Sequence, residues 1–273
     1  MASNAPGPCC VVGVKHEGDP KGTYKNIGNV ETYIAYPPSQ STERAILMLT
    51  DVIGHRFINA QLIADQFAAN GYLVVVPDLF HGDPVQLNRP DGFDIMKWLQ
   101  GPPGHLPNRV DPVVQSVIDE MRTKMGCRKI GAVGYCFGVR TPMDWGKRFI
   151  AYSILHVMLT RPPQAKYVVR FLHSGLLDAG YVAHPSFVEA DELRKIEGPL
   201  SIAAAETDSI FPAPKRHESE KILSEVGQPY QINLFSGVEH GFAVRADISK
   251  PHLKFAKENA FIQAVTWLNQ YLV

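Results

Sequence analysis

The sequence predicts one α/β domain, with a mostly parallel central sheet and helices on both faces of that sheet. Short apolar runs rich in β-branched residues alternate with longer stretches that have the apolar spacing of helices. Polar residues suited to chemistry follow directly after several of these runs, where open α/β sheets place their ligands. The length of 273 residues suits a single domain of this class, and the chain contains no repeat.

Composition narrows the class of function. A hydrophobic content of 45% supplies a core, and 27 basic residues balance 27 acidic ones. Neither nucleic acid nor a membrane is therefore indicated as a partner. The first residues lack a signal pattern, and no apolar run near them could span a bilayer, so we expect a cytoplasmic protein. The four cysteines match no zinc spacing and predict no disulfide framework; they are Cys9, Cys10, Cys127 and Cys136.

The first half of the chain alternates between predicted strands and helices. An irregular segment precedes the first strand, which ends at a Pro-Pro pair. Gly71 ends the first helix. A Pro-rich excursion at 79–108 is more typical of a pocket wall than of core packing. The predicted strands are 30–36, 45–49, 72–76 and 130–133, and the predicted helices are 57–70 and 113–125.

The second half continues the alternation. Each predicted strand leads into a short polar loop: H-P-S after the first, E-T-D after the second and V-E-H-G after the last. A long amphipathic helix closes the domain. Alternating strands and helices indicate a parallel sheet that is covered on both faces. The predicted strands are 180–183, 200–204 and 230–235, and the predicted helices are 166–172, 215–226 and 252–271.

The stretch from Ile130 to Gly138, I-G-A-V-G-Y-C-F-G, is the centre of the functional prediction. It has the form G-x-C-x-G, the cysteine version of the nucleophile elbow, a strained strand-to-helix turn. Glycines flank the nucleophile because a Cβ would clash in so tight a turn. Cysteine serves as the nucleophile when a base lowers the pKa of its thiol. The alternative is that Cys136 is a buried structural residue.

Two further residues complete a predicted catalytic triad with Cys136. Asp208 and His240 each follow a later strand, and the order nucleophile, acid, histidine is that of α/β-hydrolases. His240 would hold the thiol proton, and Asp208 would fix the tautomer of the imidazole. Glu206 is the alternative acid. Taken singly, such an Asp is usually a turn residue and such a His structural, but their order and placement together favour catalysis.

An oxyanion site is expected beside the nucleophile. The backbone N–H of Phe137 lies at the first turn of the helix after the elbow, and we expect it to donate one hydrogen bond. The second donor is expected from the loop at 50–53, where we assign the N–H of Val52.

These stretches resemble the dienelactone hydrolases (carboxymethylenebutenolidases). The matching segments are V-G-Y-C-F-G, P-D-L-F-H-G, A-H-P-S-F-V, E-T-D and E-H-G-F-A-V-R, and the resemblance spans roughly 12–138 and 165–273. It implies a single α/β-hydrolase fold without a large cap domain. It also implies a Cys–His–Asp triad that opens lactone or ester rings with neither cofactor nor metal ion.

The resemblance also implies three residues around the substrate. Asp51 takes the position of an acidic residue that contacts the resting thiol, where bacterial members carry Glu. Arg245 follows the histidine and is the candidate to bind a substrate carboxylate, with a solvated surface charge as the alternative. His81 takes the place of a second substrate contact after P-D-L, with a loop or capping role as the alternative.

The resemblance is interrupted at 139–164, and the family pattern closes without a seam when this segment is removed. Its first codons can begin with GT, its last can read CAG, and Leu159-Thr160 can encode a branch-point sequence. We interpret it as an in-frame intron that is translated, with low activity or poor folding as the expected consequence. The alternative is a genuine lid-like helix over the site. Genomic DNA without the GT and AG ends would refute the intron.

The sequence thus predicts a carboxylic ester hydrolase that acts on a small lactone or on an enol or carboxylic ester through an acyl-enzyme. One alternative is a thioesterase or polyketide-tailoring hydrolase with the same triad. Another is a catalytically impaired binding protein with this fold. The chain is expected to be a monomer or a homodimer.

Overall fold

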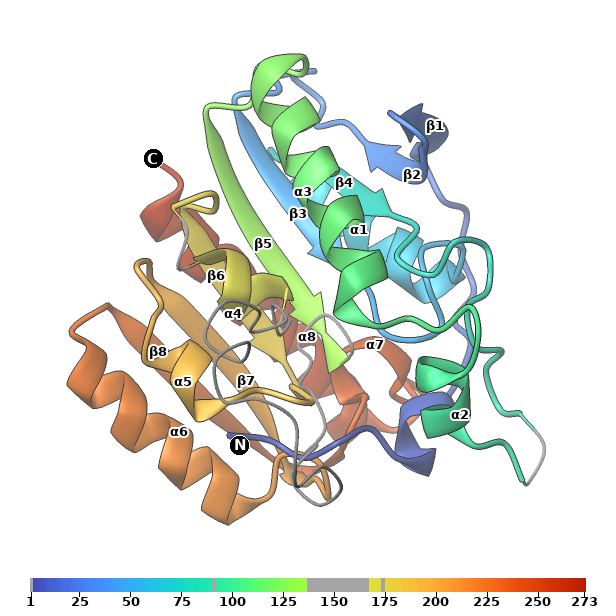
Figure 1. Ribbon diagram of the computed structural model, residues 1–273, viewed down its shortest axis with the longest axis vertical. Helices are drawn as coiled ribbons and strands as arrows, with labels where there is room; N and C mark the ends of the chain where they lie inside the picture. The colour runs from blue at the N-terminus through green and yellow to red at the C-terminus, as the bar shows by residue number, and fades with distance from the viewer. Residues whose placement is uncertain (1, 90–91, 137–166, 173–174) are drawn as a thin grey trace, which may run out of the picture.

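The computed structural model describes residues 2–89, 92–136, 167–172 and 175–273, so the predicted Phe137 donor and the segment 139–164 lie outside the described residues. Eight described strands form one sheet in the order β1-β2-β4-β3-β5-β6-β7-β8 (Figure 1). Their bounds are β1 (Thr23–Ile27), β2 (Val30–Ala35), β3 (Arg44–Leu49), β4 (Leu73–Pro77), β5 (Lys129–Tyr135), β6 (Ala179–Ala183), β7 (Leu200–Thr207) and β8 (Tyr230–Glu239).

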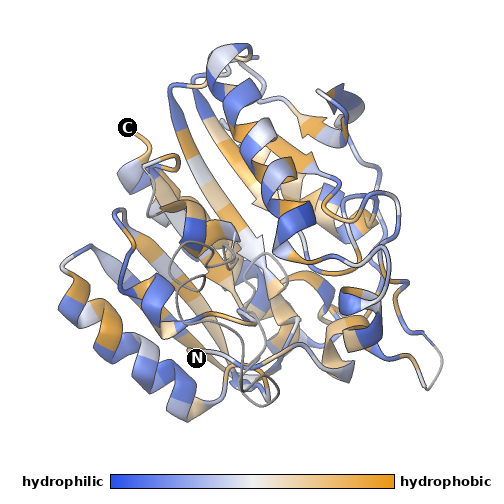
Figure 2. Cartoon of the chain, in the orientation of Figure 1, coloured by the Kyte–Doolittle hydropathy of each residue, from blue (hydrophilic) through white to orange (hydrophobic). Residues whose placement is uncertain are grey.

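The sheet is parallel from β4 to β8, and β1 and β2 add an antiparallel edge. The inner strands β3 and β4 read R-A-I-L-M-L and L-V-V-V-P, and nearly all of their residues are buried. Continuous apolar runs are typical of parallel strands because helices cover both faces of the sheet. Figure 2 shows these central strands as largely hydrophobic, whereas the outer helix α6 (Ala213–Val226) carries polar turns. The predicted α/β class is confirmed.

Helices cover both faces of the sheet, and side-chain contacts identify the two layers. Phe67 of α1 stacks on Phe261 of α8 with ring centroids 4.7 Å apart. On the other layer, Arg170 of α4 forms an ion pair with Asp111 of α3 at 2.9 Å. No described helix has the length and apolar character needed to cross a bilayer. The bounds not yet given are α1 (Ile58–Ala69), α2 (Ile95–Gln100), α3 (Pro107–Thr123), α4 (Tyr167–Leu172), α5 (Ala190–Leu193), α7 (Phe242–Arg245), α8 (Pro251–Tyr271) and the 3-10 turn η1 (Pro8–Val11).

Two strand glycines let helices approach the sheet closely. A Cβ on Gly131 of β5 would lie 2.7 Å from the side chain of Leu268 in α8. A Cβ on Gly180 of β6 would lie 3.0 Å from Val168 in α4. Both distances are shorter than ordinary van der Waals contact. Glycine at these two positions therefore lets α8 and α4, which cover opposite faces, pack closely against the sheet.

The structure differs from the predicted elements at a few boundaries. Helix α3 begins at Pro107, six residues before the predicted start, and Pro112 lies inside it. Proline is tolerated near a helix start, but its ring removes one backbone hydrogen bond, so the sequence alone favoured a later start. The strand β1 and the short helices α2 and α7 were not predicted. Four of the five side chains of β1 are exposed, so this strand lacks the apolar alternation that marks a strand.

The N-terminal arm, residues 2–16, crosses the carboxyl edge of the sheet. It is held by hydrogen bonds to loops and helices that follow five different strands, so an extended segment with little structure of its own is fixed in place. These bonds are Ser3 N to Val188 O at 2.9 Å, Asn4 N to Ile210 O at 2.6 Å, Asn88 N to Val11 O at 2.7 Å, Val14 N to Arg245 O at 3.0 Å and His16 N to Asn59 Oδ1 at 2.7 Å.

Candidate active site

Cys136 follows the last residue of β5 in a strained conformation. Its φ is 48°, in the left-handed region that residues with a Cβ rarely adopt. Such a conformation costs of order 1–3 kcal/mol and persists only where the surroundings enforce it. This is the backbone expected of a nucleophile elbow, and the side chain of Cys136 is fully buried.

His240 and Asp208 meet at the carboxyl ends of two neighbouring parallel strands. Asp208 directly follows β7, and His240 directly follows β8. The Nδ1 atom of His240 lies 2.9 Å from Oδ2 of Asp208. The other oxygen of Asp208 accepts hydrogen bonds from the backbone N–H groups of Ile210 and Phe211, at 2.8 Å and 3.1 Å. The carboxylate is therefore fixed, and it holds the imidazole by Nδ1 so that Nε2 points towards the buried thiols.

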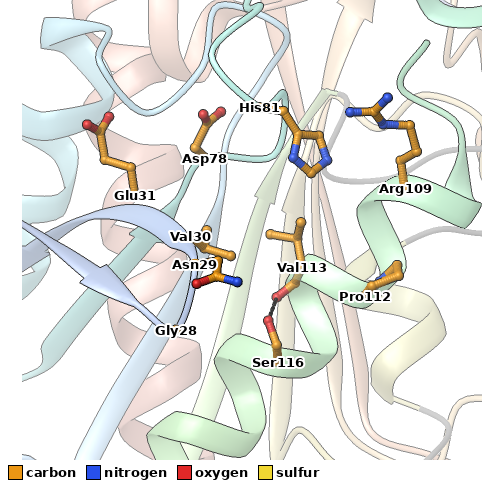
Figure 3. A pocket seen from close by; sticks show the side chains of 10 residues that line it. All are labelled: Gly28, Asn29, Val30, Glu31, Asp78, His81, Arg109, Pro112, Val113 and Ser116. Atoms are coloured by element: carbon orange, nitrogen blue, oxygen red, sulfur yellow. Dashed lines mark hydrogen bonds between the residues drawn. The ribbon is translucent and has the colours of Figure 1, made fainter. Parts of the chain in front are cut away.

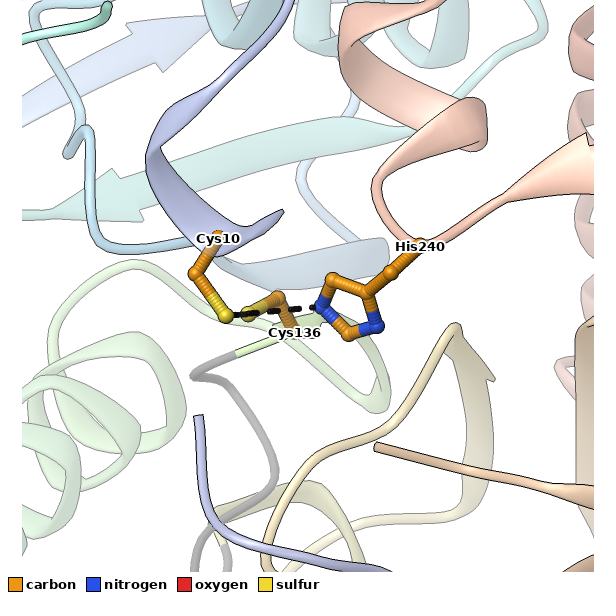
Figure 4. Close-up of side chains that lie close together, drawn as sticks. All are labelled: Cys10, Cys136 and His240. Carbon is orange, nitrogen blue, oxygen red and sulfur yellow. Dashed lines mark hydrogen bonds between the residues drawn. The ribbon is translucent and has the colours of Figure 1, made fainter. Parts of the chain in front are cut away.

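A second cysteine, Cys10 of the N-terminal arm, lies against both Cys136 and His240 (Figure 4). The Cys10 sulfur is 3.4 Å from the Cys136 sulfur and 3.7 Å from Nε2 of His240. All three side chains are buried, and their sulfur and nitrogen atoms lie within 4.8 Å of one another. The site thus contains two thiols and one imidazole, with Asp208 behind the imidazole.

The electrostatics of the site favour a thiolate beside an imidazolium. Burial opposes ionisation of the Cys136 thiol, but the hydrogen bond from Cys10 and the charge of His240 lower its pKa well below the usual range. Burial likewise opposes protonation of His240, but the charge of Cys136 and the bond to Asp208 raise its pKa to about 10. Burial raises the pKa of the Cys10 thiol, and the hydrogen bond to Cys136 adds to the effect.

The loop after β6 packs against another side of Cys136. The hydroxyl of Ser186 donates to the backbone oxygen of Cys136 at 3.1 Å, and its Oγ lies 3.8 Å from the Cys136 sulfur. His184 is fully buried, and its ring lies edge-on to that of His240 at 5.0 Å between centroids. Burial lowers the pKa of His184 well below its usual value, and the charges of His240 and Arg245 lower it further, so this second imidazole is neutral.

The chain matches the model of the dienelactone hydrolase family over residues 30–152 and 165–272. Hydrolase tropI of Talaromyces stipitatus is 52% identical over 277 residues, covering 100% of this chain and 99% of tropI. Hydrolase pyvD of Aspergillus violaceofuscus is 51% identical over 272 residues, covering 100% of this chain and 99% of pyvD. The crystal structure of a dienelactone hydrolase from Anabaena variabilis superimposes with a TM-score of 0.61 at 10% identity, covering 94% of this chain and all of that one. The chain belongs to the dienelactone hydrolase family.

The family match confirms the predicted resemblance and makes the protein a hydrolase of this family. Residues 153–164 are not part of the match. Residue 164 is also the predicted end of the inserted segment, whereas 139–152 fall inside the match. The insertion and its origin therefore stay predictions.

Of the two predicted oxyanion donors, Val52 lies in the described structure. Leu49 at the end of β3 pairs with Gly134 of β5, so the loop that carries Val52 runs beside the elbow. Val52 is fully buried, and its carbonyl accepts a hydrogen bond from Val85 N at 2.9 Å. The assignment of its N–H to an oxyanion site stays a prediction, as does that of Phe137.

Asp51 and Arg245 form a buried ion pair with each other. Arg245 Nη1 bonds to Asp51 Oδ2, and both side chains are 1% exposed. Burial raises the pKa of the Asp51 carboxyl, against the opposing charge of the Arg245 guanidinium. Arg245 also donates to the carbonyls of Val12 and Cys9 in the N-terminal arm, at 3.2 Å and 3.4 Å. The pair thus joins the loop after β3 to the arm that carries Cys10.

The third predicted substrate contact, His81, lines a separate cavity. This cavity has a volume of about 490 Å³, and its described lining includes Glu31, Asp78 and Arg109 but no member of the triad. Figure 3 shows the His81 ring beside Arg109, between the turn after β1 and helix α3. Its role as a contact for a substrate at Cys136 stays a prediction.

Sequence reasoning did not place Cys10 or Ser186 at the site. Cys10 lies 126 residues before Cys136 and 230 before His240, so no local spacing links them. Ser186 lies in the A-H-P-S-F-V stretch that carries the family resemblance, and this is the one signal that pointed to its loop.

Breaking the Asp51–Arg245 pair is expected to destabilise the protein. Asp51→Asn leaves the Arg245 cation buried without its counterion, which costs about 3–5 kcal/mol of unfolding free energy. Urea denaturation of Asp51→Asn, Arg245→Gln and the double variant measures this cost. The double variant should lose less than the sum of the two single losses, because it leaves no unpaired charge. Additive losses would mean that the pair does not act as a unit.

Proposed function

We propose that this hydrolase opens a small lactone, or cleaves an enol or carboxylic ester, through a triad of Cys136, His240 and Asp208. The observation that carries the proposal is the bond of 2.9 Å between His240 Nδ1 and Asp208, with the opposite ring nitrogen facing the sulfurs of the elbow. The left-handed φ of 48° at Cys136 supports the role of this residue as the nucleophile.

The reaction begins with the Cys136 thiolate. Its lone pair attacks the carbonyl carbon, and the tetrahedral intermediate carries the negative charge on the carbonyl oxygen. Collapse of the intermediate breaks the bond to the ring or ester oxygen, and His240 donates its Nε2 proton to that oxygen. In a lactone the leaving oxygen stays attached, so the acyl-enzyme carries the whole opened ring.

Water then completes the cycle. His240, now neutral, takes a proton from a water molecule that attacks the thioester carbonyl, and Cys136 leaves as a thiolate. Asp208 holds the ring orientation through both steps and stabilises the imidazolium each time it forms. The proton that His240 gave to the leaving oxygen is thus replaced by one from water, and the thiolate–imidazolium pair is regenerated.

The described arrangement corresponds to a resting state, because Cys10 occupies space that the substrate needs. A carbonyl carbon must come within about 3–3.5 Å of the attacking sulfur. The Cys10 sulfur already lies 3.4 Å from Cys136 and 3.7 Å from His240. Binding of substrate therefore requires the Cys10 side chain, or the N-terminal arm that carries it, to move aside.

A reducing compartment suits this chemistry, and we retain the cytoplasm as the proposed location. All four cysteines are free thiols, including the two that lie 3.4 Å apart at the site. A free thiol nucleophile persists where the surroundings keep cysteines reduced.

Alkylation with iodoacetamide between pH 5 and pH 10 tests the poised thiolate. We expect Cys136 to react at a rate that is already high near neutral pH, because its pKa is lowered. Cys127 is the internal control, because burial raises the pKa of this thiol to about 11 and its reaction should accelerate only in alkali. Trypsin places the thiols on separate peptides: 1–15 carries Cys9 and Cys10, 125–128 carries Cys127 and 130–140 carries Cys136.

Substrate profiling distinguishes the proposed lactone or ester hydrolysis from thioesterase activity. A dienelactone, an enol acetate, a simple aryl ester and an acyl thioester should be compared by kcat/KM on the same preparation. We expect the lactone or enol ester to exceed the thioester. A Cys136 that alkylates no faster than Cys127 at neutral pH would remove the catalytic proposal altogether.

A further inference from the structure

Three donor atoms that suit a soft metal ion converge at the active site. They are the sulfurs of Cys10 and Cys136 and the Nε2 atom of His240, all buried and all within 4.8 Å of one another. We propose that Cys10, Cys136 and His240 form a site for Zn²⁺, with the fourth coordination position open to a water molecule. The N-terminal arm supplies one ligand, so the site exists only while the arm is docked.

The observed separations are close to those of a tetrahedral zinc site. With Zn–S bonds of about 2.3 Å and a Zn–N bond of about 2.0–2.1 Å, tetrahedral angles place two sulfurs about 3.8 Å apart and a sulfur and a nitrogen about 3.6 Å apart. The two sulfurs lie 3.4 Å apart, and the Cys10 sulfur lies 3.7 Å from Nε2. These two separations need side-chain shifts of a few tenths of an ångström. The Cys136 sulfur and Nε2 lie within 4.8 Å of each other and would have to reach about 3.6 Å when the ion binds.

The second layer of contacts also suits a zinc ligand. A metal-bound imidazole usually donates its other N–H to a carboxylate, which fixes the tautomer and the ring. His240 does so to Asp208 at 2.9 Å, and the Asp208 carboxylate is held by the N–H groups of Ile210 and Phe211. The lone pair of Nε2 is thereby directed at the sulfurs.

Charge balance favours the complex in this buried place. Two thiolates balance the charge of Zn²⁺, and the Asp208 carboxylate behind His240 adds one further negative charge. The nearest cation, Arg245, is already paired with Asp51. Binding requires both sulfurs as thiolates and the imidazole neutral, so protons are released when the ion binds and the affinity rises with pH. The absence of a carboxylate ligand disfavours Ca²⁺ and Mg²⁺.

Bound zinc would hold the nucleophile and the base out of the reaction. This inhibitory consequence rests on the proposed function of Cys136, whereas the binding of the ion does not. The sequence predicted no metal site because Cys10 and Cys136 are 126 residues apart and match no zinc spacing.

Cobalt serves as the spectroscopic probe of the site. The full chain, freed of metal and kept reduced so that no Cys10–Cys136 disulfide forms, is titrated with Co²⁺ and then with Zn²⁺ against a competing chelator. We expect one Co²⁺ per chain, an intense tetrahedral visible spectrum and a thiolate-to-cobalt charge-transfer band. Cys10→Ser should lose about half of the intensity of that band. It should also weaken zinc binding by at least about 100-fold, because the loss of a residue that only supports a ligand already costs up to about 100-fold.

Matched variants distinguish the two cysteines of the cluster from the two cysteines outside it. Cys127→Ser should bind zinc as the unaltered chain does, because Cys127 lies outside the cluster. Cys9→Ser should also retain the affinity, and Asp208→Asn should weaken it about 10–100-fold. Circular dichroism checks that each variant is folded, and Cys10→Ala serves if Cys10→Ser does not fold. Wild-type affinity in a folded Cys10→Ser or Cys10→Ala chain, or a cobalt complex without a charge-transfer band, would overturn the proposal.

Inhibition is measured separately on the most active substrate. Zinc should inhibit the unaltered enzyme reversibly, with recovery on adding chelator, and Cys10→Ser should require at least about 100-fold more zinc. Equal inhibition of both chains would overturn the inhibitory role of Cys10. If the protein hydrolyses none of the substrates, the cobalt spectrum still decides the metal site, so the two proposals fail independently.

Discussion

Cys136→Ala is expected to lower kcat/KM by about 10⁴-fold or more. The variant removes the only atom that forms the proposed acyl-enzyme, and what remains is the stabilisation that the oxyanion site and substrate binding supply. The backbone strain at Cys136 does not require the sulfur, so the folded state should persist. Steady-state kinetics on the best lactone or ester substrate, with enzyme concentration raised to reach the residual rate, measures the effect.

The matched control for this variant is Cys127→Ala, another buried thiol outside the cluster. It should keep wild-type kcat/KM within a factor of about two once folding is allowed for, since surface and core changes away from a site act mainly through stability. Activity that survives in Cys136→Ala but disappears in Cys10→Ala would mean that Cys10 is the nucleophile. Mass spectrometry of the acyl-enzyme trapped at low temperature distinguishes the two sulfurs directly, because their tryptic peptides differ.

His240→Ala is expected to lower kcat/KM by about 10³–10⁴-fold and to change the titration of Cys136. The positive charge of His240 lowers the pKa of the Cys136 thiol, so its removal raises that pKa towards the ordinary range of a buried cysteine. The sign of the change is therefore fixed: the alkylation rate of Cys136 should fall near neutral pH and recover in alkali. The iodoacetamide series on this variant measures both the rate and its midpoint.

The control for His240→Ala is His184→Ala, the neighbouring buried imidazole. His184 is neutral, so its removal should leave the alkylation midpoint of Cys136 near that of the unaltered chain. An unchanged midpoint in His240→Ala would refute the thiolate–imidazolium pair. Equal shifts in the two variants would point to repacking around the rings instead of to charge.

The positions of the three candidate triad residues at one edge of the sheet were predictable because each residue has a local signature. Cys136 lies between glycines after an apolar run, and Asp208 and His240 each lie directly after another such run. Parallel strands bring their carboxyl ends to one edge, so residues that follow strands in sequence become neighbours in space. The inner strands were predicted for a related reason, since burial on both faces leaves an uninterrupted apolar run that can be read without the fold.

Contacts that depend on packing alone were not predictable. Cys10 belongs to a segment with no periodic pattern, and its position against His240 depends on hydrogen bonds that the N-terminal arm makes to distant loops. The pairing of Asp51 with Arg245 likewise joins the loop after β3 to helix α7, 194 residues further along the chain. Family resemblance suggested that both residues face the substrate, but it carried no information that they bind each other.

The N-terminal arm has a consequence for how the protein acquires its activity during synthesis. The arm is made first, yet it is fixed by partners that include the loop after β7 and the backbone oxygen of Arg245. Contacts of such high sequence separation form late, because the chain between them must first be ordered. On the ribosome, the sheet can begin to assemble before the arm is fully held, because two of the bonds that fix the arm require residues 210 and 245. We therefore expect the Cys136 thiol to stay exposed for longer during synthesis than the strands around it.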